Sequence, residues 1–363
     1  MPTDYERDLA RIGEELSRLE DEPAGADRAT RIAHCLYRRA SMTGDLGALA
    51  EVEAVADAGI AELGPWPDLC FVKANVDFKL HRLERVRADL ELSPVFRASS
   101  EGRAVAADLD LEHGRYEEAR RGYESLDRSW SALARLANLE AKLGNRERAD
   151  ELYAEAEDEL TAKELRSYCW LELQRGDLDL AGAEAHYDRA ERAYSGDWLV
   201  DEHKARLRVT QGRLDEALAL YRSVAERAPR PEVQQALGDV YLRMGRTEEA
   251  RPWHDRALAT YLDSVERGGV HYLHHLAHFY LESRPDPAQA ARWARADYEL
   301  RPNPETRALW DRAIEAEKRG AEAATRPEAR REQVRHAPVG DHRLVAGAAR
   351  PGEARVGQRD ARP

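Results

Sequence analysis

Five short segments share one pattern and decide the fold. They are Gly114-Arg-Tyr-Glu-Glu-Ala119, Gly144-Asn-Arg-Glu-Arg-Ala149, Gly176-Asp-Leu-Asp-Leu-Ala181, Gly212-Arg-Leu-Asp-Glu-Ala217 and Gly245-Arg-Thr-Glu-Glu-Ala250. Their common pattern is Gly-x-x-acid-x-Ala, and successive glycines lie 30, 32, 36 and 33 residues apart. A pattern that recurs at such a spacing predicts a stack of similar structural units.

Each part of the pattern has a physical role in a pair of helices. Glycine adopts a positive φ just after the first helix ends. The acid then falls in the first turn of the second helix, where the helix dipole favours negative charge. Alanine lets the two helices approach closely. An aromatic side chain follows about four residues later and is expected to fill the space between the helices; the positions are Tyr123, Tyr153, Tyr187 (after a two-residue insertion), Tyr221 and, in the same place, His254.

The first helix of each expected pair carries a small residue where the two backbones cross. These residues are Ala74, Ala107, Ala137, Cys169, Ala205, Gly238 and Ala277. Leu237-Gly238 followed by Tyr241 matches part of the tetratricopeptide repeat consensus, and Pro229 and Pro302 match its closing proline. The sequence therefore resembles the tetratricopeptide repeat family over roughly residues 28–303, or about eight repeats. This resemblance implies an all-α, right-handed superhelical solenoid of antiparallel helix pairs.

The two ends of the chain differ from the repeats. Residues 1–24 are expected to form an N-terminal capping helix, residues 25–303 the solenoid and residues 304–320 a C-terminal capping helix. Residues 321–363 are rich in Arg, Ala, Pro and Gly and contain few large apolar side chains. Such a segment buries too little apolar surface to offset its ordering entropy, so we expect a disordered tail.

Composition and charge narrow the class of partner. The chain has 363 residues, of which 34% are charged, and residues 1–320 carry 47 Lys and Arg against 63 Asp and Glu. An acidic body repels phosphate backbones, so we expect no nucleic-acid partner. No apolar run is long enough for a membrane span or a signal peptide, which predicts a cytoplasmic protein without a membrane partner. The three cysteines lie in apolar helical patterns and are expected to be core residues.

The resemblance also implies where a partner binds. In tetratricopeptide domains the first helix of each pair lines the concave groove. Aligning this chain on its small residues places ten candidate partner-binding residues there: Asn138, Arg166, Trp170, Glu202, Arg206, Gln235, Asp239, His271, His274 and His278. The chain is therefore expected to be a protein- or peptide-binding scaffold or adaptor, although any single residue could simply belong to a solvated face. No catalytic motif is present, so we expect no enzyme activity and no cofactor. The oligomeric state stays open.

A histidine cluster supports an alternative function. The segment Val270-His-Tyr-Leu-His-His-Leu-Ala-His278 contains four of the twelve histidines. On a helix, His271, His274 and His278 would form one stripe, a spacing that suits a transition metal. Three interpretations stay open: a structural row, partner contacts that titrate near pH 6.5, and metal ligands of an accessory protein or metalloenzyme subunit. Asp239 would complete or orient such a site, and His254 is expected to be a core histidine.

Overall fold

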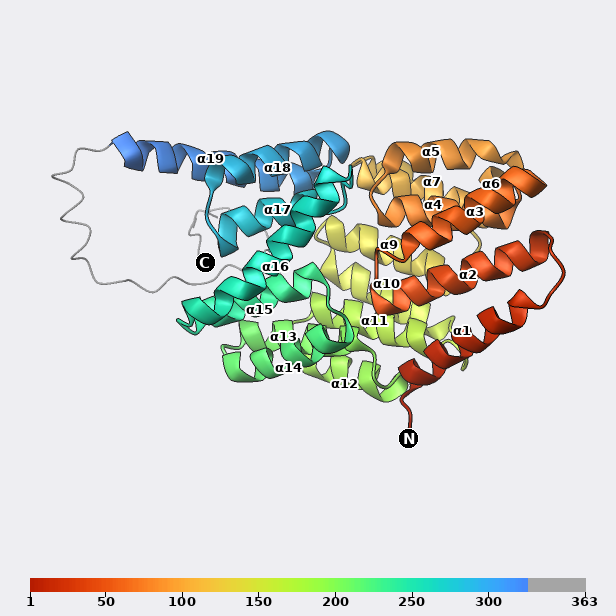
Figure 1. Ribbon diagram of the computed structural model, residues 1–363, viewed down its shortest axis with the longest axis horizontal. Coiled ribbons are helices and arrows are strands. Elements are labelled where there is room, and N and C mark those ends of the chain that lie inside the picture. The colour runs from red at the N-terminus through yellow and green to blue at the C-terminus, as the bar shows by residue number, and fades with distance from the viewer. Residues whose placement is uncertain (326–363) are drawn as a thin grey trace, which may run out of the picture. The chain divides into compact units, whose positions relative to one another are not determined.

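Helices account for all regular structure in the part of the chain that the computed structural model describes, residues 1–325 (Figure 1). Helix α1 (Asp4–Glu20) comes first, and eight helix pairs follow it. The pairs are α2 (Ala26–Thr43) with α3 (Leu49–Leu63), α4 (Pro67–Lys79) with α5 (Leu83–Leu92), α7 (Ser100–Glu112) with α8 (Tyr116–Glu124), α9 (Trp130–Lys142) with α10 (Arg146–Asp158), α11 (Leu165–Leu178) with α12 (Ala183–Ala193), α13 (Trp198–Thr210) with α14 (Leu214–Arg227), α15 (Pro231–Arg243) with α16 (Thr247–Glu266), and α17 (Leu273–His278) with α18 (Pro287–Leu300). The predicted all-α solenoid of about eight repeats is confirmed.

Three further elements lie between or after the pairs. A short helix, α6 (Pro94–Ala98), precedes α7, and a π-helical turn, η1 (Phe279–Ser283), continues α17. Helix α19 (Pro304–Thr325) follows the last pair, and its Leu309 and Ala313 are buried against α17 and α18 as a cap requires. The helix runs past the predicted boundary at residue 320, and the remainder of the predicted tail lies outside the described residues.

The pattern glycines behave as predicted in four repeats and differently in one. Gly114, Gly144, Gly212 and Gly245 have φ values of 71°, 84°, 73° and 74°. Gly176 instead lies inside α11, because the two-residue insertion moves the turn toward the next helix. A Cβ on Gly176 would lie 2.4 Å from Cε1 of Tyr187. This glycine therefore permits close packing and does not form the turn.

The residues predicted to pack between paired helices are buried. Six of the seven small residues of the first helices are at most 2% exposed, the seventh, Gly238, is buried, and the five aromatic positions are at most 4% exposed. Burying a large side chain of this kind contributes about 1.5–3 kcal/mol. Cys70 and Cys169 are buried as predicted, whereas Cys35 is only partly buried. The local pairing of helices thus follows from the repeat itself.

The first pair and the sixth pair meet directly, which nearest-neighbour stacking does not produce. The Trp198 side chain at the start of α13 is 1% exposed, and its indole N–H donates to the carbonyl oxygen of Met42 at 2.8 Å. The Tyr5 hydroxyl of α1 donates to the same oxygen at 3.1 Å. Gly44, just after α2, has a φ of 69° and packs against the Trp198 ring. We call these contacts the tryptophan joint.

Helix α1 extends the tryptophan joint to the end of α12. The Asp4 carboxylate accepts hydrogen bonds from the backbone N–H and the hydroxyl of Ser195 at 3.0 and 2.6 Å. The Tyr194 hydroxyl donates to Asp8 at 3.0 Å. Figure 1 shows α1 running beside α2 with its first turn near α12. The predicted capping helix therefore covers α2 and also connects the first pair to later pairs.

Pairs near the N-terminus also contact pairs near the C-terminus, through an ion pair and through histidines. Arg301, after α18, forms an ion pair with Glu112 of α7 at 3.1 Å, and the Asn303 amide donates to the Glu112 carbonyl oxygen at 2.9 Å. His81, in the turn between α4 and α5, lies with its ring centroid 5.7 Å from that of His274. We call the cluster of His81, His271, His274 and His275 the histidine joint.

Burial keeps the histidine joint neutral. Loss of hydration, together with positive charge on Arg301 and neighbouring histidines, lowers the pKa of His81 to about 3. Burial likewise lowers the pKa of His271 and of His275 to about 4, although Glu232 opposes the shift in both. These imidazoles therefore gain protons on unfolding at mildly acidic pH, which makes the joint sensitive to acid.

No helix among the described residues has the length and apolar character needed to cross a membrane.

The tryptophan joint predicts unequal effects of the same substitution at two glycines. Gly44 and Gly212 have φ values of 69° and 73°, so alanine should cost each about 1–2 kcal/mol through backbone strain. A Cβ on Gly44 would also lie 2.9 Å from the Trp198 ring, whereas nothing lies within 4 Å of one on Gly212. We expect Gly44→Ala to lower the thermal midpoint more than Gly212→Ala. Equal losses would contradict close packing at the joint.

The histidine joint predicts loss of stability on acidification. An unfolded histidine has a pKa near ~6.5, and the folded values of His81, His271 and His275 are lower. The unfolded chain therefore binds more protons below that pH, and stability falls as pH drops from about 6.5 toward 4, by up to about 1.4 kcal/mol per pH unit for each histidine. Thermal unfolding across this range measures the effect.

A matched pair of variants assigns the acid sensitivity to the histidine joint. Asparagine tolerates the positive φ of 56° at His81, so His81→Asn should keep the turn and flatten the pH dependence. His113→Asn changes a histidine at the end of α7, outside the joint, and should leave the wild-type dependence in place. The assignment fails if His81→Asn, like His113→Asn, retains the wild-type dependence of stability on pH.

Candidate binding groove

Two cavities share a pair of tryptophans in their linings. The larger, of about 620 Å³, lies between α1, α2, α11 and α13, and the smaller, of about 370 Å³, lies between α7, α9 and α11. Trp130 and Trp170 line both cavities. We call the two connected cavities the central groove.

The tryptophans are positioned by the ends and pairing of their helices. Trp130 is the first residue of α9, which begins where the Ser129 hydroxyl accepts a hydrogen bond from the Ala132 N–H at 3.3 Å. Trp170 on α11 packs edge-on against Tyr153, with ring centroids 6.3 Å apart. Both side chains are partly exposed, so their rings are available to a ligand in the groove.

One wall of the larger cavity comes from the start of α11. The Arg166 guanidinium lies 3.6 Å from the Asp197 carboxylate and 3.5 Å from the Ser41 carbonyl oxygen. Burial raises the pKa of Asp197, while the positive charge of Arg166 and the hydrogen bond from the Leu199 N–H oppose that rise. Lys163 lies on the same wall and is exposed. This wall therefore presents two cationic side chains.

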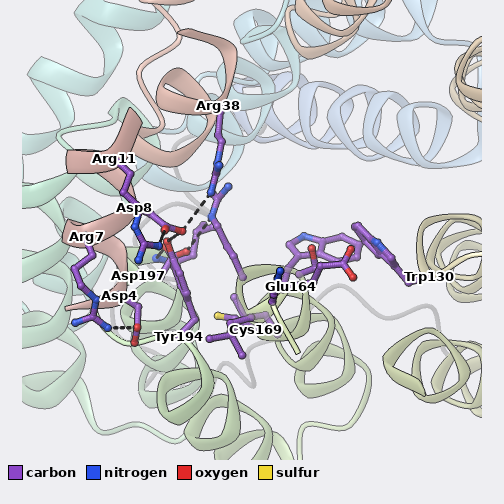
Figure 2. Close-up of a pocket in the computed structure, with 17 residues that line it drawn as sticks. Asp4, Arg7, Asp8, Arg11, Arg38, Trp130, Glu164, Cys169, Tyr194 and Asp197 are labelled. Carbon is purple, nitrogen blue, oxygen red and sulfur yellow. Dashed lines mark hydrogen bonds and ion pairs between the residues drawn. The ribbon is translucent and has the colours of Figure 1, made fainter. Parts of the chain in front are cut away.

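The opposite wall is supplied by α1 and α2. Figure 2 shows Arg7, Arg11 and Arg38 on this side and Trp130 on the other. Asp8 lies at the centre of the wall and accepts hydrogen bonds from Arg11 at 3.2 Å and Arg38 at 3.3 Å. Because the tryptophan joint brings α1 here, this wall consists of residues distant in sequence from α11.

Three of the ten residues predicted for the concave groove lie in the central groove. Arg166 and Trp170 line the larger cavity, and Asn138 lines the smaller one beside Trp170. The Asn138 side-chain oxygen lies 3.5 Å from the Tyr153 hydroxyl, which donates to it. The structure therefore brings together predicted residues from the fourth and fifth pairs.

The predicted residues of the sixth and seventh pairs lie elsewhere and mostly bind their own chain. Arg206 donates to Asp177 at 2.9 and 2.8 Å, and Glu202 is partly buried. The remaining two, Gln235 and Asp239, contact side chains of α16 and η1. Gln235 accepts from the Tyr261 hydroxyl and donates to Ser283, each at 3.0 Å, and Asp239 lies 2.9 Å from Nε2 of the buried His254. His254 is thus the core histidine that the sequence predicts.

The prediction that His271, His274 and His278 share one helical stripe is wrong for His271. Helix α17 begins only at Leu273, because Gly268 and Gly269 end α16 and a turn follows. The other two side chains also have separate surroundings. His274 packs on His81, and His278 lies 3.3 Å from Glu282 and accepts a hydrogen bond from Arg312 at 3.0 Å.

A metal centre finds no geometric support in the described residues. Within residues 1–325, no three His, Cys, Asp or Glu side chains are placed so that they could hold an ion. Asp239 orients His254 and not a histidine of α17. Metal binding by His271, His274 and His278 stays a prediction.

The sequence missed the residues that α1 and α2 contribute. Arg7, Arg11 and Arg38 belong to segments expected to cap or begin the stack, and no repeat pattern relates them to α11. Trp130 was not among the predicted groove residues because it lies one residue before the aligned concave positions. Its place directly after the N-cap residue Ser129 was the available signal.

Comparison with known proteins supports the repeat assignment. Residues 208–267 match the family model described as tetratricopeptide repeat. Searching the curated proteins gave no match.

Two solved structures resemble the fold. The hetero-tetramer of Cut9 and Hcn1 from the APC/C matches with a TM-score of 0.52 at 16% identity, over 86% of this chain and 62% of that chain. This chain thus spans less than two thirds of that one. The human IFIT1 dimer with m7Gppp-AAAA matches with a TM-score of 0.51 at 12% identity, over 85% of this chain and 76% of that one. The family match over residues 208–267 and the eight helix pairs together show that the chain has the fold of a tetratricopeptide repeat solenoid.

Proposed function

We propose that this chain is a protein- or peptide-binding scaffold and that the central groove is its binding surface. The observation that carries this proposal is the pair of partly exposed tryptophans, Trp130 and Trp170, where two cavities meet. Large aromatic side chains in a concave site supply much of the affinity of protein interfaces. The helix-pair solenoid supports a binding role, and the groove gives that role a location.

The concave positions farther along the chain are less suited to a partner. Gln235 and Asp239 already bond to side chains of α16, so a ligand would have to replace those bonds. Breaking a buried hydrogen bond without full replacement costs about 1–3 kcal/mol. The central groove requires no such exchange at its tryptophans.

The class of partner is also part of the proposal. The human IFIT1 structure contains m7Gppp-AAAA, but its likeness to this chain extends to the fold alone. The acidic body of this chain, with 63 Asp and Glu against 47 Lys and Arg in residues 1–320, favours a protein or peptide over a nucleic acid. We further propose a non-catalytic, cytoplasmic role.

Replacing both groove tryptophans tests the proposal. We expect Trp130→Ala/Trp170→Ala to abolish recovery of partner proteins that the wild-type chain captures from a lysate of its source cells. The reason is loss of most of the apolar contact surface in the groove. Quantitative mass spectrometry of the captured proteins, followed by binding of the purified partner, is the measurement.

The control is Trp253→Ala, which removes a tryptophan from a separate cavity between α14, α15 and α16. This variant should capture the same partners as the wild type. If the Trp253 variant loses them while the double variant keeps them, the binding surface lies elsewhere. Matching circular dichroism spectra establish that each variant is folded.

The alternative function, a metal-binding accessory protein or metalloenzyme subunit, has a direct test. Because the described residues supply no group of three ligands, we expect untagged protein to contain less than stoichiometric metal. Elemental analysis after growth with zinc, copper, nickel or iron measures the content. A stoichiometric metal that His274→Ala/His278→Ala removes would establish the alternative.

A further inference from the structure

We infer that the central groove recognises an internal anionic side chain of a peptide, a carboxylate or a phosphate monoester, next to a large apolar side chain. This inference rests on the proposed function and specifies the chemistry of its ligand. It follows from the hydrogen-bonding groups of the larger cavity, its tryptophans and the charge of the surrounding body.

Cationic side chains face the larger cavity from both walls. Arg7, Arg11 and Arg38 come from α1 and α2, and Lys163 and Arg166 come from the start of α11. Four acids also line the cavity: Asp4, Asp8, Glu164 and Asp197. The excess of positive formal charge is therefore small. Which ligand the cavity binds depends on which of these charged groups already form hydrogen bonds within the protein.

The lining acids already accept hydrogen bonds from the protein. Asp4 binds Ser195, and Asp8 binds Tyr194, Arg11 and Arg38. Glu164 and Asp197 also accept hydrogen bonds, each from a residue close to it at the start of a helix. Glu164 accepts from the N–H and hydroxyl of Thr161, each at 2.9 Å, and Asp197 accepts from the Leu199 N–H at 3.1 Å. These carboxylates are engaged, so a cationic ligand would have to compete for them.

The cationic groups retain donors. An arginine carries five N–H groups and a lysine three. Arg11 and Arg38 each form one hydrogen bond, both to Asp8, and the exposed Lys163 forms none within the described chain. Unused donors on two facing walls suit an anion, because ionised acceptors form the strongest hydrogen bonds with them.

An apolar surface lies beside these donors. Leu165 follows Glu164 into α11 and is 42% exposed. Trp130 and Trp170 continue the apolar surface toward the smaller cavity. A ligand with an anionic side chain next to an aromatic or aliphatic one would satisfy both parts.

The groove continues on both sides of the tryptophans, which favours an internal side chain over a chain end. Phe78 and Leu111 also line the smaller cavity, so a bound segment has apolar lining to contact in addition to the two tryptophans. The acidic body also limits the ligand to a locally anionic one. Parts of a long polyanion more than about 10 Å from the cations of the groove would be screened from them, and would face the acidic side chains of the body instead.

Four pools of short peptides test the inference on the full chain. All are acetylated and amidated, share a central Trp, and carry Glu, Gln, phosphoserine or Lys as the next residue, with the other positions randomised. Binding is measured by fluorescence anisotropy of the labelled pools. We expect the Glu and phosphoserine pools to bind about tenfold more tightly than the Gln pool, and the Lys pool to bind most weakly. Comparing Glu with phosphoserine distinguishes the two sources of anion.

Two variants locate the effect. Lys163→Gln removes an exposed cation that has no partner among the described residues, so the fold should persist while the preference for Glu over Gln falls severalfold. Arg103→Gln removes the same charge from an exposed site on α7 outside the cavity and should leave the preference unchanged.

The outcomes separate this inference from the proposed function. Equal binding of the Glu and Gln pools, lost in Trp130→Ala/Trp170→Ala, would overturn the anionic preference and leave the groove as a peptide site. Absence of binding by every pool would overturn both. A preference that survives Lys163→Gln but weakens in Arg103→Gln would place anion recognition outside the groove and overturn the inference.

Discussion

The buried indole of Trp198 fixes the arrangement on which the central groove depends. Its N–H donates to the carbonyl oxygen of Met42, and that oxygen also accepts from Tyr5, so one backbone group connects α1, α2 and α13. A buried indole N–H without an acceptor would cost about 1–3 kcal/mol. The folded chain is therefore strongly biased toward this geometry. Without it, the hydrogen bonds of Asp4 with Ser195 and of Asp8 with Tyr194 would have to hold α1, and with it the second wall of the cavity, in place.

This joint changes how a repeat solenoid behaves. A stack in which each unit contacts only its neighbours gains stability one interface at a time. Here the first and sixth pairs share a core contact, and the third pair binds residues after the eighth through Arg301 and Glu112. Opening one joint exposes surface on pairs far apart in sequence. Unfolding of the pairs should therefore be coupled more strongly than the repeat sequence alone implies.

The local pattern predicted the helix pairs that carry it because its causes are local. Positive φ at Gly212, the buried small residue Ala205 and the aromatic Tyr221 all act within one repeat. The joints have no such periodic signal. In the sequence, Trp198 is one more residue at the start of a helix, and Arg38 lies in a segment expected to begin the stack. Arg166 and Trp170, which the repeat alignment selected, consequently line the larger cavity, whereas the side chains that face them across it could not be inferred.

The two joints respond differently to acid because their chemistry differs. The tryptophan joint uses an indole, a phenol and backbone groups, together with Asp4, whose pKa is lowered chiefly by the hydrogen bonds from Ser195. None of these groups gains a proton between pH 7 and pH 5. The histidine joint instead keeps His81 neutral by burial against its ordinary tendency to protonate in that range. Mild acid therefore weakens the contact between the end pairs before it affects α1, and the groove that α1 completes retains its two walls.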